Sequence, residues 1–142
     1  MSIGVGVNQV HRDFDYKMKR FKYKVESGAE WAIIQPVFDL QAFYTFIEYI
    51  EKHNIKIPIV AGIWPQLRFL NAQFMNNEVP GVFIIETIMK RMEEPQYPED
   101  AKKLGVEIAK RMVEELADTV QGIQVSPPFG KVDISLDVLC LN

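Results

Sequence analysis

Residues able to bind a ligand stand where the predicted strands of this chain end. Gln35 closes the apolar run Trp31–Ile34, and its side-chain amide offers two N–H donors and an acceptor oxygen. Alignment of the predicted strands sets Asn8, Trp64 and Ser126 at corresponding ends. In parallel α/β folds, ligands bind at the carboxyl ends of the strands. Gln35 is therefore a candidate ligand-binding residue; the alternative is a buried amide satisfied by neighbouring backbone groups.

A cluster of cations occupies the first predicted helix, residues 13–27. One interpretation is a solvated helix face, which the helix dipole favours near its carboxyl end. The other is contact with a phosphate-bearing ligand. The composition of the helix favours the solvated face. The cations are Lys17, Lys19, Arg20, Lys22 and Lys24.

Groups that could donate a proton or bind a metal are scarce at the predicted strand ends. His11 and His53 are isolated in the sequence, which is typical of surface histidines. Asp39 precedes an amphipathic helix and is better explained as its N-cap than as a base. Cys140 is the only cysteine, which excludes an internal disulfide and a thiolate metal cluster. The predicted site can orient a ligand but lacks an evident proton donor.

The elements that must position these residues alternate regularly between strand and helix. The spacing between consecutive strands is that of βαβ units, and right-handed crossovers place the strands side by side in one parallel sheet. An α/β fold is therefore expected. Strands are predicted at 3–7, 31–35, 57–63 and 120–126, and helices at 13–27, 40–53, 67–77, 85–92, 101–116 and 133–141.

Length and charge limit the classes of protein to which the chain could belong. A chain of 142 residues with 48% hydrophobic content can form one compact domain. A net charge of -3 gives no reason to expect nucleic acid or an acidic membrane as a partner. The chain has no apolar run of about 20 residues and no signal-peptide pattern, so a cytoplasmic location is expected. A strand at 3–7, directly after the start, suggests an incomplete domain.

Four ordered segments of the chain are distinctive: GAEWAIIQPVFD at 28–39, PIVAGIWP at 58–65, NAQFMNNEVPGV at 71–82 and QGIQVSPPFG at 121–130. These segments resemble the methylenetetrahydrofolate reductase family. The last two are most similar to the reductase domain of bifunctional homocysteine S-methyltransferase/methylenetetrahydrofolate reductases. The weaker dinucleotide-binding pattern Gly4-x-Gly6 lacks its third glycine, because position 9 is Gln9.

The resemblance implies a fold and a reaction. The family fold is a TIM (β/α)8 barrel of roughly twice this length. Residues 1–142 would form a single partial domain, the carboxyl-terminal half with strands five to eight. The reaction implied is FAD-dependent reduction of 5,10-methylenetetrahydrofolate to 5-methyltetrahydrofolate with NAD(P)H, a step of one-carbon metabolism and methionine biosynthesis.

The resemblance also implies roles for particular residues. Gln35 matches a glutamine that contacts the folate pterin and the reduced nicotinamide, and Phe69 matches a phenylalanine that packs on either ligand. Lys24 matches a basic residue at the FAD diphosphate. Gly6 and Val7 fall where the chain follows the ribityl and diphosphate part of the flavin.

Two positions depart from the family pattern, and no catalytic residue is assigned to this chain. Val7 replaces the tyrosine of some members, and Arg20 replaces an asparagine that contacts FAD in others. The family's catalytic acids belong to the first half of the barrel. The isolated chain is therefore expected to be inactive, and to self-associate or bind a chain that supplies the first half.

Two alternatives stay open at this point. One is a folate- or flavin-binding half-barrel with no activity of its own. The other is a methyltransferase that uses the folate methyl group, which would need a metal or cobalamin site for which the sequence offers no ligands.

Overall fold

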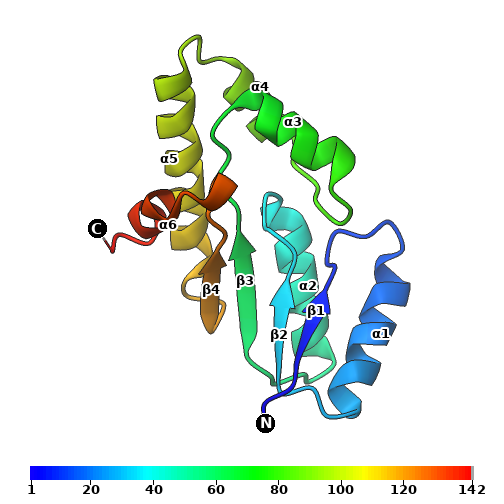
Figure 1. Cartoon of the computed structure of the whole chain (residues 1–142). Helices are drawn as coiled ribbons and strands as arrows, with labels where there is room; N and C mark the ends of the chain where they lie inside the picture. Colours follow the sequence, from blue (N-terminus) through cyan, green and yellow to red (C-terminus); the bar gives the residue numbers. More distant parts are fainter. Residues whose placement is uncertain (142) are drawn as a thin grey trace.

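The computed structural model describes residues 1–141, which form a four-stranded parallel sheet and six α-helices (Figure 1). The strands lie in sequence order, as the βαβ spacing predicts. The strands are β1 (Gly4–Val7), β2 (Trp31–Ile34), β3 (Ile59–Ile63) and β4 (Gly122–Val125). The helices are α1 (Phe14–Glu26), α2 (Leu40–Lys52), α3 (Phe69–Glu78), α4 (Glu86–Glu93), α5 (Pro98–Leu116) and α6 (Val132–Val138), with a 3-10 turn, η1, at Pro128–Gly130.

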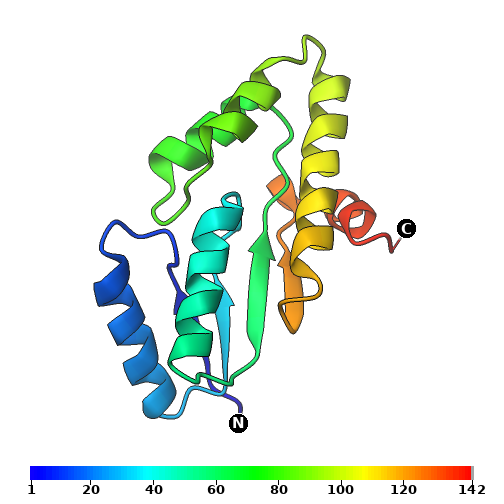
Figure 2. The same ribbon diagram turned by 180° about the vertical axis from the view of Figure 1, so that it is seen from behind.

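Helices cover one face of the sheet and leave the other face open. Figure 2 shows α2 and α5 in front of the strands, with α1 beside β1, whereas Figure 1 shows the uncovered face. Alternate strand residues point toward the helices and join a core with Phe21, Phe43 and Phe46. These strand residues are Val7, Ala32, Ile34, Ile59, Ala61 and Ile63.

The uncovered face carries the remaining strand residues, those that alternate with the core residues. Trp31 remains 36% exposed there, although the apolar run to which it belongs predicts a strand buried on both faces. Ile33 and Val60, which are paired across the strands, are only half-buried. The sheet is therefore apolar on both faces but packed on one.

The strands are staggered, and the stagger corrects one expectation. Ile33 pairs with Val60, so the position opposite Gln35 is Gly62, and the amide of Val37 donates to the Gly62 carbonyl at 2.9 Å. Trp64 therefore lies two residues farther along, and not level with Gln35 as the strand alignment predicted. A sheet that closes into a barrel requires such a shift of register.

Local capping fixes where the helices begin. The carboxylate of Asp39 accepts from the amides of Gln41 at 3.0 Å and Ala42 at 3.3 Å, which confirms its predicted role as a helix cap. Asp13 caps α1 in the same way. The last helix is shorter than predicted, because α6 ends at Val138.

A second apolar cluster joins α3, α4 and α5 to the loops after β2 and β3. It contains Phe38, Ala72, Val82, Ile84, Ile88 and Met92. Gly105 of α5 approaches the loop after β3 closely: a Cβ on it would lie within the Gln66 carbonyl group, 2.7 Å from the carbonyl carbon. This cluster positions the loops at the carboxyl ends of the strands.

Candidate functional site

Gln35 is the residue after β2, on the open face and at the carboxyl end of the sheet. It follows Trp31 and Ile33 at steps of two residues, so it lies on the same face of the sheet as they do. Its side chain lies against the loop before α4, where a Cβ on Gly81 would be 3.2 Å from its Cδ and Nε2. Within residues 1–141, hydrogen bonds reach the Gln35 backbone and none reaches its side-chain amide. The amide is therefore free to bind a ligand.

Gln9 was not singled out from the sequence as a site residue, yet it holds the backbone of Gln35. Its side chain is only 3% exposed. Its Nε2 donates to the Gln35 carbonyl oxygen at 2.9 Å, and its Oε1 accepts from the Gln35 amide at 3.0 Å. A single glutamine in a polar loop gives no sequence signal for such a contact, because the contact depends on how the loop folds back.

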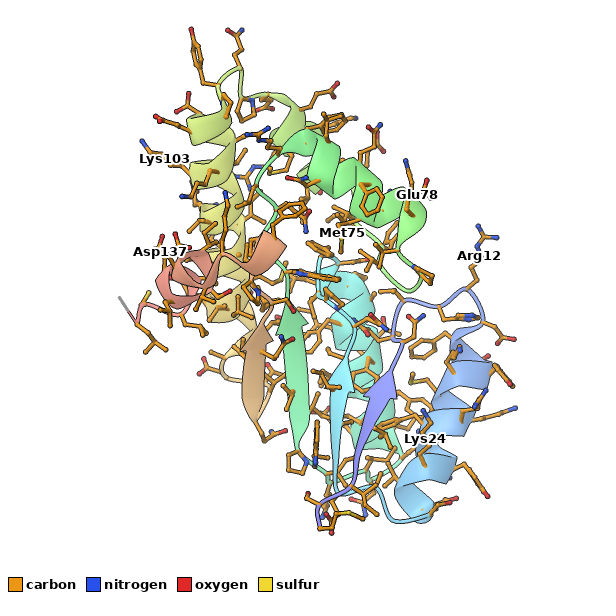
Figure 3. All side chains as sticks on the ribbon, viewed as in Figure 1. Arg12, Lys24, Met75, Glu78, Lys103 and Asp137 are labelled. Atoms are coloured by element: carbon orange, nitrogen blue, oxygen red, sulfur yellow. The ribbon has the colours of Figure 1, made fainter. Side chains whose placement is uncertain are left out.

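Lys24 and Gly6, both predicted to contact the FAD, lie together in the structure. The Lys24 Nζ donates to the Gly6 carbonyl oxygen at 3.1 Å, and the side chain lies between α1 and β1 (Figure 3). The carbonyls of Ile3 and Val7 accept from residues at β2, so the intervening carbonyl of Gly6 faces the free edge of β1. Lys24 thus satisfies an edge carbonyl and keeps further N–H donors for a ligand.

The space above Gly6 is open. A Cβ on Gly6 would meet no atom within 4 Å, whereas a Cβ on Gly4 would collide with the Trp31 indole. Gly6 therefore leaves room beside the Lys24 ammonium group. The pair fits a phosphate-bearing ligand that lies along the end of β1.

Val7 is buried in the structure, and Phe69 is half-buried. The Val7 side chain is 5% exposed and belongs to the core under the helices, so a ligand could reach only its backbone. Phe69 begins α3 and packs against the second apolar cluster. A cleft of about 140 Å³ after β3 and β4 is lined instead by other aromatic residues, among them Trp64, Phe74 and Phe129. The roles of Val7 and Phe69 stay predictions.

Acid–base residues near the site are held by backbone groups. Asp39 and His11 line an open cleft of about 530 Å³ together with Asn8 and Gly81. The Asp39 carboxylate caps α2, and the His11 Nδ1 accepts from the amide of Asp13 at 3.0 Å. In the described part of the chain, no group of three or more His, Cys, Asp or Glu side chains could hold a metal ion. None of the helices in this part is long and apolar enough to cross a membrane.

The perturbed pKa values belong to groups elsewhere in the fold. Burial raises the pKa of Tyr49 on α2, and the charges of Asp15 and Glu26 add to this effect. The hydrogen bond between Lys110 and Asp137, at 2.8 Å, raises the pKa of Lys110 and ties α5 to α6. These groups have structural roles distant from Gln35.

The family model of methylenetetrahydrofolate reductase matches residues 6–126. The chain belongs to the methylenetetrahydrofolate reductase family. The match includes the end of β1, Lys24, Gln35 and all of β2, β3 and β4.

Curated members of the methylenetetrahydrofolate reductase family are similar to this chain. Methylenetetrahydrofolate reductase 2 of Schizosaccharomyces pombe is 29% identical over 104 residues, which cover 70% of this chain and 16% of that protein. Methylenetetrahydrofolate reductase 1 of the same organism is 24% identical over 105 residues, 71% of this chain and 17% of that protein. The 5,10-methylenetetrahydrofolate reductase of Buchnera aphidicola is 43% identical over 54 residues, 38% of this chain and 18% of that protein.

A solved structure shares the fold. An uncharacterized protein from Clostridium thermocellum, which binds two copies of 5-methyl-5,6,7,8-tetrahydrofolic acid, matches with a TM-score of 0.61 at 18% identity. The match covers 99% of this chain and 52% of that chain. The expected fold, an α/β unit equivalent to half of a TIM barrel, is thereby confirmed. The aligned part spans less than a fifth of each of the three curated relatives.

Proposed function

We propose that this chain forms the carboxyl-terminal half of a methylenetetrahydrofolate reductase barrel and supplies part of its folate and flavin sites. The observation that carries the proposal is the free side-chain amide of Gln35, on the open face at the carboxyl end of β2. A carboxamide can donate to a ring oxygen and accept from a ring N–H at the same time, which suits the edge of a pterin. The reaction would convert 5,10-methylenetetrahydrofolate to 5-methyltetrahydrofolate, within one-carbon metabolism and methionine biosynthesis.

Lys24 and Gly6 fit the phosphate-bearing part of FAD. The ammonium group 3.1 Å from the Gly6 carbonyl oxygen would neutralise part of a diphosphate charge, and the absence of a Cβ on Gly6 leaves room for the ligand. When bound, the flavin would take a hydride from NAD(P)H and pass it to the folate. The chain's own contribution would be to bind and orient, with Gln35 on the substrate and Lys24 on the cofactor.

Location and assembly follow from the same proposal. The free and exposed Cys140 suits a reducing compartment, and we place the protein in the cytoplasm. The open face of the sheet, with Trp31 and Ile33, would lie inside the complete barrel and face its other half. That half could come from another chain.

Replacing Gln35 with alanine should weaken binding of 5-methyltetrahydrofolate about tenfold, because one or two hydrogen bonds to the substrate are lost. The affinity for FAD should not change. Both are measured on the full chain by titration, with quenching of the fluorescence of Trp31 and Trp64, the two tryptophans of the chain. Gln73→Ala, at an exposed glutamine of α3, is the matched control. Equal folate affinities for Gln35→Ala and Gln73→Ala would contradict the role of Gln35.

Replacing Lys24 with methionine should weaken FAD binding about three- to tenfold, since one charge-assisted contact to the diphosphate is lost. Riboflavin, which has no phosphate, should bind equally well to the variant and the parent chain. Lys19→Met, at an exposed lysine of the same helix, is the control for charge. If Lys24→Met lowers the unfolding temperature and leaves FAD affinity unchanged, Lys24 serves only the edge carbonyl of β1.

The purified chain should self-associate. Both β1 and β4 have an unpaired edge, and the sheet has an uncovered face with a 36% exposed Trp31. Dynamic light scattering at concentrations on the order of tens of micromolar tests this expectation. A single monomeric species in that range would show that the open edges are protected in another way.

A further inference from the structure

We propose that Gln9 is a positioning residue that holds the backbone of Gln35 and thereby orients the amide that binds the substrate. The inference rests on the proposed function of Gln35. It assigns a role to a residue that would not itself touch the ligand.

The contact between Gln9 and Gln35 resembles one more pair of hydrogen bonds between neighbouring strands. β1 ends at Val7, and Gln9 then presents its side-chain amide to both the N–H and the C=O of Gln35, at 3.0 and 2.9 Å. The Gln35 amide is also 3.1 Å from the Val7 carbonyl oxygen. The side chain of Gln9 thus continues the backbone pairing of β1 with β2 beyond the point where β1 stops.

The position of Gln35 makes this support necessary. The paired residues of β1 and β2 end at Val7 and Ile34, so no backbone N–H of β1 reaches the Gln35 carbonyl. The carbonyl of Gln35 would otherwise lack a partner in a part-buried position. Because Gln9 is 3% exposed, water cannot easily replace its amide.

The loop around Gln9 is itself fixed, which allows it to act as a rigid support. The Oδ1 of Asn8 accepts from the amide of Val10 at 3.1 Å and closes a turn directly after β1. The Asn8 side chain and the Gln35 side chain meet the same neighbour, since a Cβ on Gly81 would lie 3.3 Å from the Asn8 Nδ2 and 3.2 Å from the Gln35 Cδ. Three loops therefore converge on Gln35: those after β1 and β2, and the one before α4.

The Gln35 side chain is therefore oriented by its surroundings but makes no hydrogen bond of its own to the described part of the chain. Gln9 holds the backbone of Gln35, and the Gln35 side chain lies against the loop at Gly81. Within residues 1–141, no hydrogen bond reaches the side-chain amide. A ligand would not have to order Gln35 on binding. Loss of such order typically weakens binding by about three- to tenfold for one flexible side chain.

The test uses the full chain with Gln9→Met, which keeps the length of the side chain and removes both hydrogen bonds. NMR relaxation of the Gln35 backbone amide and side-chain NH₂ measures order directly. Both should be rigid in the parent chain and mobile in the variant. Gln9→Asn, which keeps an amide but is too short to reach both groups, should act in the same direction and replaces Gln9→Met if that variant fails to fold.

Affinity for 5-methyltetrahydrofolate provides the second measurement. Gln9→Met should weaken it about three- to tenfold, but should have no further effect in a Gln35→Ala chain, because there is no amide left to orient. A loss of stability alone would act equally in both backgrounds. Unchanged order of Gln35 in the Gln9 variants overturns the proposal, as does unchanged folate affinity in a chain that binds folate. If Gln35 loses order and even the parent chain binds no folate, the support by Gln9 stands and the proposed function fails.

Discussion

A Gly105→Ala chain is expected to unfold roughly 10 °C or more below the parent chain, a large loss for one methyl group. Gly105 lies in α5, where the backbone of the helix meets the loop after β3. A Cβ at this position would fall within the Gln66 carbonyl group, 2.7 Å from its carbon. The obstacle is backbone and cannot rotate away, so α5 would have to move off the loop.

Two opposing effects decide the size of this loss. Alanine favours a helix over glycine by about 1 kcal/mol. Overpacking a buried contact costs about 1–3 kcal/mol when side chains can adjust, and more is expected here because the loop and α5 must separate. Separation would also open the second apolar cluster, in which Ile88 and Met92 are buried against this helix. The steric effect should therefore exceed the gain in helix propensity.

The measurement is thermal unfolding of the full chain, followed by circular dichroism. Gly6→Ala is the matched control, because a Cβ on Gly6 meets no atom within 4 Å. It should unfold at the parent temperature or slightly above, since alanine restricts the unfolded chain. Equal unfolding temperatures for the two variants would mean that α5 adjusts to the added methyl group with ease.

Features with a local signal could be predicted from the sequence. Asp13 and Asp39 precede amphipathic segments and cap α1 and α2 in the structure. Gly28, with φ at +109°, directly follows the helix predicted at 13–27 and suits its carboxyl-terminal end. The alternation of strands and helices also predicted the parallel order of the strands, because crossovers between parallel strands are right-handed.

Features that depend on contacts between distant segments could not be predicted. Neither strand sequence indicates the stagger that places Gly62 opposite Gln35. A register with Gly62 and one with Trp64 opposite Gln35 would both bury apolar residues. The exposure of Trp31 depends on whether the open face is covered. Gln9 sits in a loop with no periodicity, and its contact with Gln35 spans 26 positions of the sequence.

For the candidate site, the resemblance to the family predicted more than the residues alone. Composition favoured a solvated role for the basic helix, whereas the family pattern singled out Lys24. The structure places Lys24 beside Gly6, two residues that the resemblance assigned to the same ligand. Phe69 is half-buried, as Lys24 is, whereas Val7 is buried in the core.

A sample that contains only these 142 residues is expected not to reduce 5,10-methylenetetrahydrofolate at a measurable rate. The substrate must receive a proton to open its five-membered ring before it can accept a hydride, and a positioned general acid typically contributes about 10²–10⁴-fold. In the open cleft lined by Asn8 and Gly81, the carboxyl and imidazole groups are those of Asp39 and His11. The Asp39 side chain caps α2 by accepting from the Gln41 amide, and the Nδ1 of His11 accepts from the amide of Asp13.

The assay is anaerobic oxidation of NADH or NADPH in the presence of FAD and 5,10-methylenetetrahydrofolate, with the chain alone and with the amino-terminal half of a related reductase added. The chain alone should show no folate-dependent oxidation, because half a barrel leaves one side of the flavin exposed to water and supplies no acid. The added half should restore activity if its strands pair with the free edges of β1 and β4. Asp39→Asn in the restored assembly should then keep most of the activity, since asparagine also caps a helix. Turnover by the chain alone, abolished by Asp39→Asn or His11→Gln, would instead identify an acid within this half and assign it catalytic residues of its own.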